Sequence, residues 1–399
     1  MAHALGGLKL SFSPRDQALL NALGQQLAKS AGSRGEAARG WDDRTVAGAV
    51  AGLAKLHVRH EAALLALGRR ALSIESRLGA RPTASILHSL ATLNCAAGAT
   101  HTAVADRLGM RFAVQAEHEL RAAKLLGDRC HRPRKRRKGQ HERSQGDWAT
   151  PRMAVSVAWS LTVLDRLSPA PLRAAMDVLT AAEGRAEGSV ADVRLLCQLH
   201  QVLLAVELGH VMPCPDRSRR PVQQPDRCPE ASEEAREAVA SLPCGLAQRS
   251  RRVFRKVSRR VPQAQLRKQQ RCPPSVDSTG SVAEALALAC PGERVQKEGV
   301  LDNCAYSVDL VLPERRLAVE VDGKVHFARR GPWELDLENP SGGAQVLGRT
   351  ALKRRQIRAM GWRLVAVPYW EWDDLLAEGG GAAVHFLAGQ ARGSVASNA

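Results

Sequence analysis

The chain has 399 residues, is 44% hydrophobic, and carries 58 Lys and Arg against 40 Asp and Glu, a net charge of +18. This length predicts two or three domains. No apolar run reaches the roughly 18 residues that cross a bilayer, so we expect no membrane span. The nine cysteines are scattered without a C-x-x-C pair, which is typical of reduced structural thiols.

The excess positive charge is concentrated in the middle of the chain. Residues 1–128 carry a net +6, residues 129–272 a net +14 and residues 273–399 a net −2. A polyanion is the natural partner of such a surface, because basic side chains release the counterions of its phosphates. A solubilising surface or a targeting signal is the alternative interpretation.

Residues 1–210 read as helices with a repeating pattern. Apolar residues fall at helical intervals in four segments, Thr45–Leu56, Ser85–Leu93, Met153–Leu164 and Leu195–Val206. The equivalent residues Leu53, Leu90, Leu161 and Leu203 are 37, 71 and 42 residues apart, and a second amphipathic stretch follows these helices. A helix pair recurring at this interval predicts an α-solenoid, with an irregular helical domain as the alternative.

A basic block interrupts the helical array at residues 129–143. Seven of the ten residues 129–138 are Lys or Arg, among them Arg134, Lys135, Arg136, Arg137 and Lys138. Such a block repels itself, so we expect it to be disordered. It is a candidate RNA-contacting arm, with a nuclear or organellar address or a solvated loop as alternatives.

Residues 211–275 are interpreted as a Pro-rich, basic linker that contains a short acidic helix. Its last part, Arg249–Arg260, has seven basic residues in twelve with apolar residues between them. As a helix this segment suits RNA, and less well an acidic membrane surface. The candidate RNA contacts are Arg251, Arg252, Arg255 and Lys256.

From about residue 276 the pattern changes to mixed α/β. Two alternating strands are predicted at Tyr306–Leu312 and from Leu317, then a basic helix at Thr350–Gly361 and a third strand, with residues 381–399 as a flexible tail. If residues 313–316 close a hairpin, Asp309 lies opposite Glu320, with Cβ atoms about 5 Å apart. The same face of the second strand would then carry Asp322, Lys324 and His326.

Like charges placed opposite each other are destabilising unless a cation or a proton lies between them. Asp309, Glu320 and Asp322 with Lys324 are the groups that a Mg²⁺-dependent phosphodiesterase needs, since carboxylates hold the metal and lysine helps to activate water. Glu284 on the preceding helix could supply another carboxylate. On the basic helix, Lys353, Arg354 and Arg358 are either phosphate contacts or a solvated face.

Two stretches, "YSVDLVLPERRLAVEVDGKVHF" and "GRTALKRRQIRAMGWRLVAVPYWEWDDL", resemble the RAP domain, and through it the restriction-endonuclease-like fold with the PD-(D/E)XK pattern. The resemblance covers roughly Val282 to Leu376. The helical copies resemble the degenerate octotricopeptide and FAST-kinase-like repeats. If Asp309 and Glu320 are matched to the two acids of the nuclease pattern, Asp322 stands where the lysine is expected. If Asp322 and Lys324 are matched to the second acid and the lysine instead, the lysine follows a glycine and lies at the end of the strand.

The resulting interpretation is an α + α/β protein: an N-terminal α-solenoid over residues 1–210, a basic linker, and a restriction-endonuclease-like RAP domain over residues 276–380. The resemblance implies an RNA-binding protein of a mitochondrion or plastid that acts in transcript processing, stability or translation. RNA and organellar ribosomal or RNA-processing proteins would be its partners, and a non-catalytic RAP domain would need no cofactor.

Two alternatives stay open. One is an endoribonuclease that uses Mg²⁺ at Asp309, Glu320 and Asp322. The other is a helical-repeat adaptor that binds protein, which would gain nothing from the basic middle segment. The first twenty residues predict neither a secretory signal nor a convincing transit peptide.

Overall fold

The computed structural model describes residues 14–32, 40–126, 149–183, 192–212, 229–269, 278–302, 304–328 and 344–392. These residues divide into two compact units, the first running to Ser250 and the second beginning at Arg251. None of the helices in the described ranges is both long enough and apolar enough to cross a membrane.

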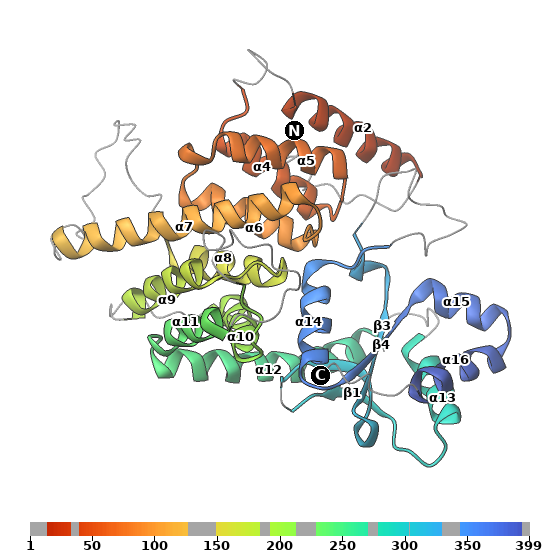
Figure 1. Cartoon of the computed structure of the whole chain (residues 1–399). Coiled ribbons are helices and arrows are strands. Elements are labelled where there is room, and N and C mark those ends of the chain that lie inside the picture. Colours follow the sequence, from red (N-terminus) through yellow and green to blue (C-terminus); the bar gives the residue numbers. More distant parts are fainter. Residues whose placement is uncertain are drawn as a thin grey trace. The chain divides into compact units, whose positions relative to one another are not determined.

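The first unit is helical, and its helices pack in two rows. One row is α4, α6, α8 and α10, each in contact with the next, and the other is α2, α5, α7, α9 and α11. Figure 1 shows these helices following one another from α2 (red) to α11 (green). Their bounds are α2 Pro14–Ala31, α4 Asp43–Lys55, α5 Glu61–Ser73, α6 Ala80–Thr92, α7 Ala99–Leu126, α8 Pro151–Val163, α9 Pro169–Glu183, α10 Val193–Glu207 and α11 Pro229–Ala240.

The four predicted amphipathic helices are confirmed, and together they form the first row. They are α4, α6, α8 and α10, and the equivalent residues Leu53, Leu90, Leu161 and Leu203 are all buried. Each of these helices therefore buries its apolar stripe against neighbouring helices rather than within a single pair.

These four helices also end in the same way. A residue with positive φ follows each C-cap leucine: His57, Asn94, Asp165 and Gly209. One residue further on, the N–H of Val58 donates to the carbonyl of Leu53 at 2.9 Å, and the corresponding bonds close the ends of the other three helices. This 6→1 bond is the Schellman motif, which stops a helix and turns the chain.

The predicted linker and the predicted flexible tail both contain helices, and the sequence had predicted the acidic helix of the linker. Residues 211–275, interpreted as a linker, contain α11 and α12 (Cys244–Gln269), and α11 packs on α9 and α10. The compact helical unit therefore extends past residue 210. The predicted flexible tail contains α16 (Gly380–Arg392) instead, with Ala383, Leu387 and Ala391 buried. The basic block at residues 129–143 lies outside the described residues.

The second unit holds a four-stranded sheet in the order β1-β2-β3-β4. The pairs β1–β2 and β2–β3 are antiparallel, whereas β3–β4 is parallel and is joined through α14. A parallel pair requires such a crossover. The elements are α13 Ser278–Ala289, β1 Gln296–Val300, β2 Ser307–Leu312, η4 Pro313–Arg315, β3 Leu317–Asp322, η5 Lys324–His326, α14 Gly348–Ala359, β4 Arg363–Pro368, α15 Tyr369–Ala377 and α16.

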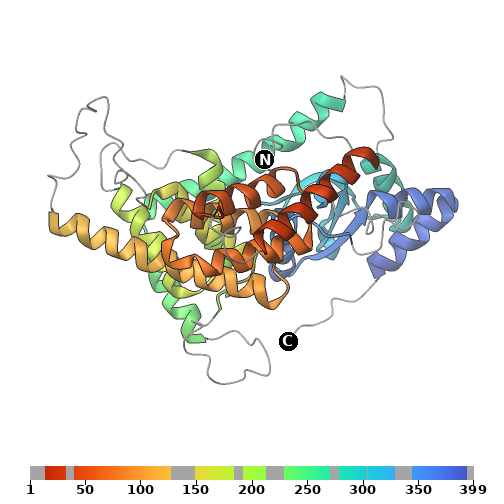
Figure 2. The same cartoon turned by 90° about the horizontal axis from the view of Figure 1, so that it is seen from above.

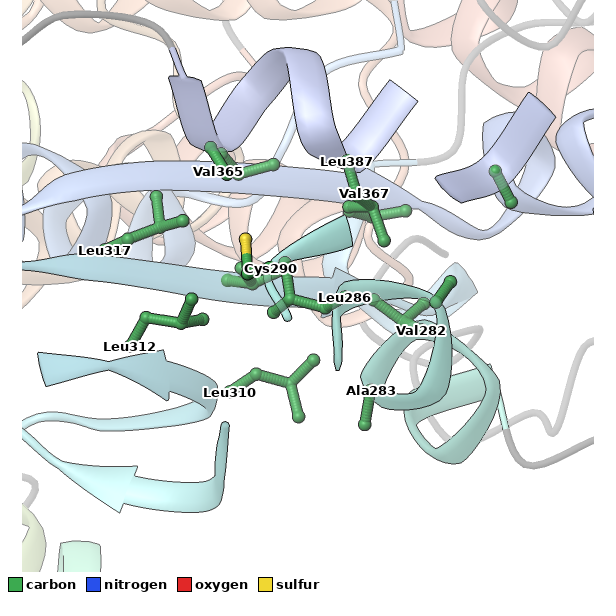
Figure 3. Packing of buried hydrophobic residues seen from close by; sticks show 14 of the residues in the cluster. Val282, Ala283, Leu286, Cys290, Leu310, Leu312, Leu317, Val365, Val367 and Leu387 are labelled. Atoms are coloured by element: carbon green, nitrogen blue, oxygen red, sulfur yellow. The ribbon is translucent and has the colours of Figure 1, made fainter. Parts of the chain in front are cut away.

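The sheet has an apolar face and a polar face, and helices cover both. The apolar face packs against α13, α15 and α16. The core between them includes Val282 and Leu286 of α13 and Leu310, Leu317 and Val367 of the sheet (Figure 3). The turned view shows α13 and α16 next to each other (Figure 2). In Figure 1, α14 lies on the other side of β3 and β4 from these helices. The polar residues of β3 therefore face a helix rather than solvent.

Candidate functional site: a buried acid cluster beneath α14

The carboxylates predicted to share a face lie together in the structure. Leu312 pairs with Leu317 and Leu310 with Val319, as the hairpin register predicted, and the same register continues to Asp309 opposite Glu320. At that point the ladder is completed by a side chain, because Asp309 Oδ2 accepts the backbone N–H of Val321 at 2.7 Å. Glu320 and Asp322 are 3% and 0% exposed, respectively, so these two carboxylates are effectively removed from water.

Two cations from α14 neutralise these acids. Lys353 Nζ donates to both carboxylate oxygens of Glu320, at 2.6 and 2.8 Å. The neighbouring Arg354 donates from Nη2 to Asp322 Oδ2. The side chains of Lys353 and Arg354 are 23% and 15% exposed, so both ion pairs are mostly buried. A buried carboxylate needs such a partner, because an unpaired charge in the interior is costly.

The pKa of Glu320 is raised to about 7, mainly by burial and also by the nearby carboxylates of Asp309 and Asp322, against the lowering effect of Lys353. Burial also raises the pKa of Asp309, while its hydrogen bond from Val321 opposes that shift. The cluster therefore holds a proton more tightly than free carboxylates do, although Lys353 compensates part of the cost of burial.

A fourth carboxylate, missed by the sequence analysis, belongs to the same row. Lys297 pairs with Leu310 and Gly299 with Val308, so Glu298 falls opposite Asp309 in the β1–β2 register. Burial and the charge of Asp309 both raise the pKa of Glu298. This strand is hard to predict from the sequence, because "QKEGV" lacks the apolar alternation of a strand.

Lys324 does not lie on the acid face, contrary to the prediction. β3 ends at Asp322, and after Gly323 the chain forms the 3₁₀ turn η5. Lys324 is exposed, with Nζ 5.2 Å from the centre of the Tyr369 ring. The turn instead brings His326 Nδ1 within 3.1 Å of Asp322 Oδ1, an ion-pair distance if the histidine is protonated.

Glu284 does not join the cluster either. It is exposed on α13, whose buried residues Val282, Ala283 and Leu286 pack against the opposite, apolar face of the sheet. Elsewhere on the α14 side, Tyr306 donates its hydroxyl to Gln356 Oε1 at 2.6 Å in a buried contact. This hydrogen bond adds one further polar contact with α14 to the two ion pairs.

The basic residues predicted to contact RNA fall into three groups. Arg134–Lys138 lie outside the described residues. On α12, Arg251, Arg252 and Lys256 are exposed, while Arg255 Nη2 lies 3.4 Å from the carbonyl of Asp302 and donates to it. On α14, Arg358 is exposed, whereas Lys353 and Arg354 form ion pairs with Glu320 and Asp322, respectively.

The arrangement of the acids favours ion pairing over metal binding. Both oxygens of Glu320 and one of Asp322 accept hydrogen bonds from α14, so these oxygens contact cations already. Within the described ranges, no three His, Cys, Asp or Glu side chains are grouped in a way that could hold a metal ion. A metal would have to displace Lys353 to reach Glu320.

Comparison with known families identifies this part of the chain. The family model described as the RAP domain matches residues 319–388, which run from β3 through α14 and β4 into α16. The chain carries a RAP domain. The acid cluster spans the boundary of the matched segment, with Glu320 and Asp322 inside the RAP domain and Asp309 on the preceding strand.

A curated relative supports the same assignment. The chain is 41% identical over 91 residues to a rice (Oryza sativa subsp. japonica) protein named "RAP domain-containing protein, chloroplastic". The match covers 23% of this chain and 12% of the rice protein. The similarity therefore concerns one domain of a much longer relative.

Proposed function

We propose that this chain is an RNA-binding protein of organellar RNA metabolism, and that it acts in a plastid on transcript processing, stability or translation. The observation that carries the proposal is the combination of a RAP domain with two rows of stacked helices in a strongly basic chain. The name of the rice relative supports the plastid assignment. Organellar ribosomal or RNA-processing proteins would be its protein partners.

The helical unit supports this proposal through its repeated construction. Helix pairs α4–α5, α6–α7, α8–α9 and α10–α11 stack so that first helices contact first helices and second helices contact second helices. We infer an α-solenoid, because an array in which each pair contacts its neighbours is the defining feature of that architecture. The net +11 of residues 1–250 gives this unit the electrostatic character of a polyanion-binding surface.

We propose further that the RAP domain has a restriction-endonuclease-like fold in which the acid cluster is structural. The order β2–β3–α14–β4, with carboxylates on β2 and β3, supports the relationship to the nuclease fold. Lys353 and Arg354 take the place that a divalent cation would have, and Lys324 lies away from the acids. The cluster then fixes α14 on the sheet, and the domain contributes RNA contacts or a scaffold.

A Mg²⁺-dependent endoribonuclease is the second candidate, and one observation favours it. The carboxylates of Asp309, Glu320 and Asp322 lie close to one another, and the Lys353 ammonium group lies beside them. In this alternative the acids would hold the metal and Lys353 would assist the attacking water.

One titration separates the two candidates. The full chain is mixed with end-labelled single-stranded RNA at two salt concentrations, with and without millimolar Mg²⁺, and both binding and RNA length are measured. We expect salt-dependent binding and intact RNA. RNA cleavage that requires Mg²⁺ and is lost in Glu320→Gln would establish the nuclease, and an absence of binding at low salt would refute the proposed function.

A thermal-unfolding measurement provides an independent check. A ligand that binds the folded state stabilises it by about 2.7 kcal/mol at one hundred times its dissociation constant. We expect millimolar Mg²⁺ or Mn²⁺ to leave the melting temperature unchanged, because Lys353 and Arg354 occupy the acids. A metal-dependent rise that Asp309→Asn abolishes would favour the nuclease.

A further inference from the structure

An arginine recurs at one position in the first row of helices. The second residue of α4 is Arg44, and the second residues of α6, α8 and α10 are Arg81, Arg152 and Arg194. Their spacings of 37, 71 and 42 residues are those of the buried leucines that define the repeat. All four arginines are exposed, and we call them the arginine row.

Contacts between the helices show that the arginine row is also a row in space. Seven residues after the arginine, α6, α8 and α10 carry His88, Trp159 and Gln201. The His88 and Trp159 rings lie 5.3 Å apart, and Trp159 Nε1 donates to Gln201 Oε1 at 2.7 Å. Residues at the same position in neighbouring helices therefore contact each other, so α6, α8 and α10 run parallel and in register.

The helix α4 continues the same order. It packs on α6, and just beyond its end Arg59 Nη1 donates to the carbonyl of Asn94 at 3.0 Å. Arg59 lies two residues after the positive-φ residue of α4, and Asn94 is the positive-φ residue of α6. The carboxyl ends of α4 and α6 are thus adjacent, which places their amino ends, with Arg44 and Arg81, on the same side.

Helix stability does not account for these arginines. A cation in the first turn opposes the helix macrodipole, at a cost of about 0.3–1 kcal/mol each, and acidic residues are preferred there. Capping does not involve the guanidinium groups: Asp42 caps α4 by accepting from Thr45 N at 2.8 Å, and Asp192 caps α10 by accepting from the backbone N–H of Arg194 at 2.8 Å. An exposed cation at the position that helices disfavour, in four successive repeats, points to a ligand.

The positive charge of the arginine row affects the pKa of a neighbouring histidine. The pKa of His88 is lowered to about 4, mainly by burial and also by the guanidinium groups of Arg194 and Arg152. His88 is therefore neutral at physiological pH, and the charge of this edge comes from the arginines, which do not titrate. Helices in contact have axes about 8–10 Å apart, so the cations recur at a regular interval.

We propose that Arg44, Arg81, Arg152 and Arg194 form a phosphate-binding row that holds the backbone of a single RNA strand across the four helix pairs, one guanidinium per pair. This inference rests on the proposed function and names the surface of the helical unit that performs it. Guanidinium groups bind phosphate oxygens in a bidentate manner, and such contacts position a strand without reading its bases. The row therefore sets the path of the RNA along the array.

The test compares two variants of the full chain with equal charge. In the row variant, R44Q/R81Q/R152Q/R194Q, the arginine row is neutralised. In the control variant, R69Q/R121Q/R173Q/R236Q, four exposed arginines of the second row of helices are neutralised, one each from α5, α7, α9 and α11. Binding of single-stranded RNA of mixed sequence is measured at several salt concentrations, and circular dichroism verifies the fold.

We expect the row variant to bind at least about tenfold more weakly than the control variant, with a salt slope lower by about 3, since each contact to a single strand contributes about 0.7. Equal weakening in both variants would overturn the phosphate-binding row and leave RNA binding intact. No binding by the wild-type chain would refute the proposed function and the row together. Unchanged RNA binding with loss of a protein partner in the row variant would assign the row to protein recognition instead.

Chemical footprinting of the wild-type chain tests the row without any substitution. Modification of arginines by phenylglyoxal is measured with and without bound RNA, and the modified residues are identified by mass spectrometry. We expect RNA to protect Arg44, Arg81, Arg152 and Arg194 more strongly than the four control arginines. Equal protection of both sets, or protection of the control set alone, would overturn the inference even if the row variant failed to fold.

Discussion

The ion pair between Lys353 and Glu320 offers the sharpest test of how the RAP domain tolerates its buried acids. Glu320 has a pKa of about 7 in the folded chain against an ordinary value of 4.5, so the folded state binds this proton more tightly than the unfolded state. Stability is then fully present below about pH 4.5 and falls as the pH rises to about 7. Each unit of pKa difference corresponds to about 1.36 kcal/mol, so the total fall is about 3 kcal/mol.

Replacing Lys353 by methionine removes the cation that lowers this pKa. The pKa of Glu320 should rise above 7, so the stability of the variant should keep falling above pH 7 by about 1.4 kcal/mol per pH unit, where the wild type levels off. At pH 8 the loss of stability relative to wild type should therefore exceed the loss at pH 5 by about 1.4 kcal/mol. At pH 5 the loss should be much smaller, because protonation neutralises Glu320.

Native-state hydrogen exchange of the β3 amides, measured by mass spectrometry on the full chain at pH 5 to 9, reports this stability locally. Lys324→Met is the matched control, since Lys324 lies exposed over Tyr369 and should leave the profile unchanged. The double variant K353M/E320Q removes both charges and should recover most of the loss at pH 8. Identical pH profiles for wild type and Lys353→Met would show that this ion pair does not set the stability of the cluster.

Other substitutions test further parts of the account. Arg354→Met removes the guanidinium partner of the fully buried Asp322 and should cost about 3–5 kcal/mol, whereas Arg349→Met on the exposed side of α14 should cost under about 0.5 kcal/mol; urea unfolding compares the two. Asp309→Asn keeps an acceptor for the β3 backbone and removes a repelling charge, so it should be neutral or stabilising, while Asp309→Ala should cost about 1–3 kcal/mol. His57→Gly relieves a positive φ and should raise stability by about 1 kcal/mol, and an unchanged melting temperature would contradict that reasoning.

Much of the local structure could be predicted from the sequence, because it depends on periodicity. Apolar residues at helical intervals identified α4, α6, α8 and α10, and alternation identified β2 and β3. The hairpin register followed from a four-residue connection between Leu312 and Leu317, and the observed pairing agrees with it. These features are set by residues close together in the sequence.

The partners of the acids could not be predicted in the same way, because tertiary packing decides which helix covers a sheet face. The polar face of β3 looked like a surface or a metal site, and only the crossover through α14 places Lys353 and Arg354 over it. The position of Lys324 depended on Gly323, after which the strand gives way to a turn. α16 was missed because it begins with glycines, which are poor helix formers.

The sequence also marks the repeat at the carboxyl end of each first-row helix. "LAKLH", "LATLN" and "LTVLD" each place a leucine before the residue that adopts positive φ, and "VELG" does the same in the fourth copy. His, Asn, Asp and Gly are residues that tolerate this conformation best. When the copies are aligned on these helix ends, the first three copies keep the spacing of the buried leucines. In the fourth copy, α10 is two residues longer than α4, α6 and α8.

Crosslinking of the protein to RNA in living cells, followed by sequencing of the bound RNA, tests the central claim most directly. We expect recovery of plastid transcripts well above an untagged control, with sharply reduced recovery from the row variant and normal recovery from the control variant. Recovery no higher than the untagged control, or recovery of transcripts from outside the organelles, would contradict it.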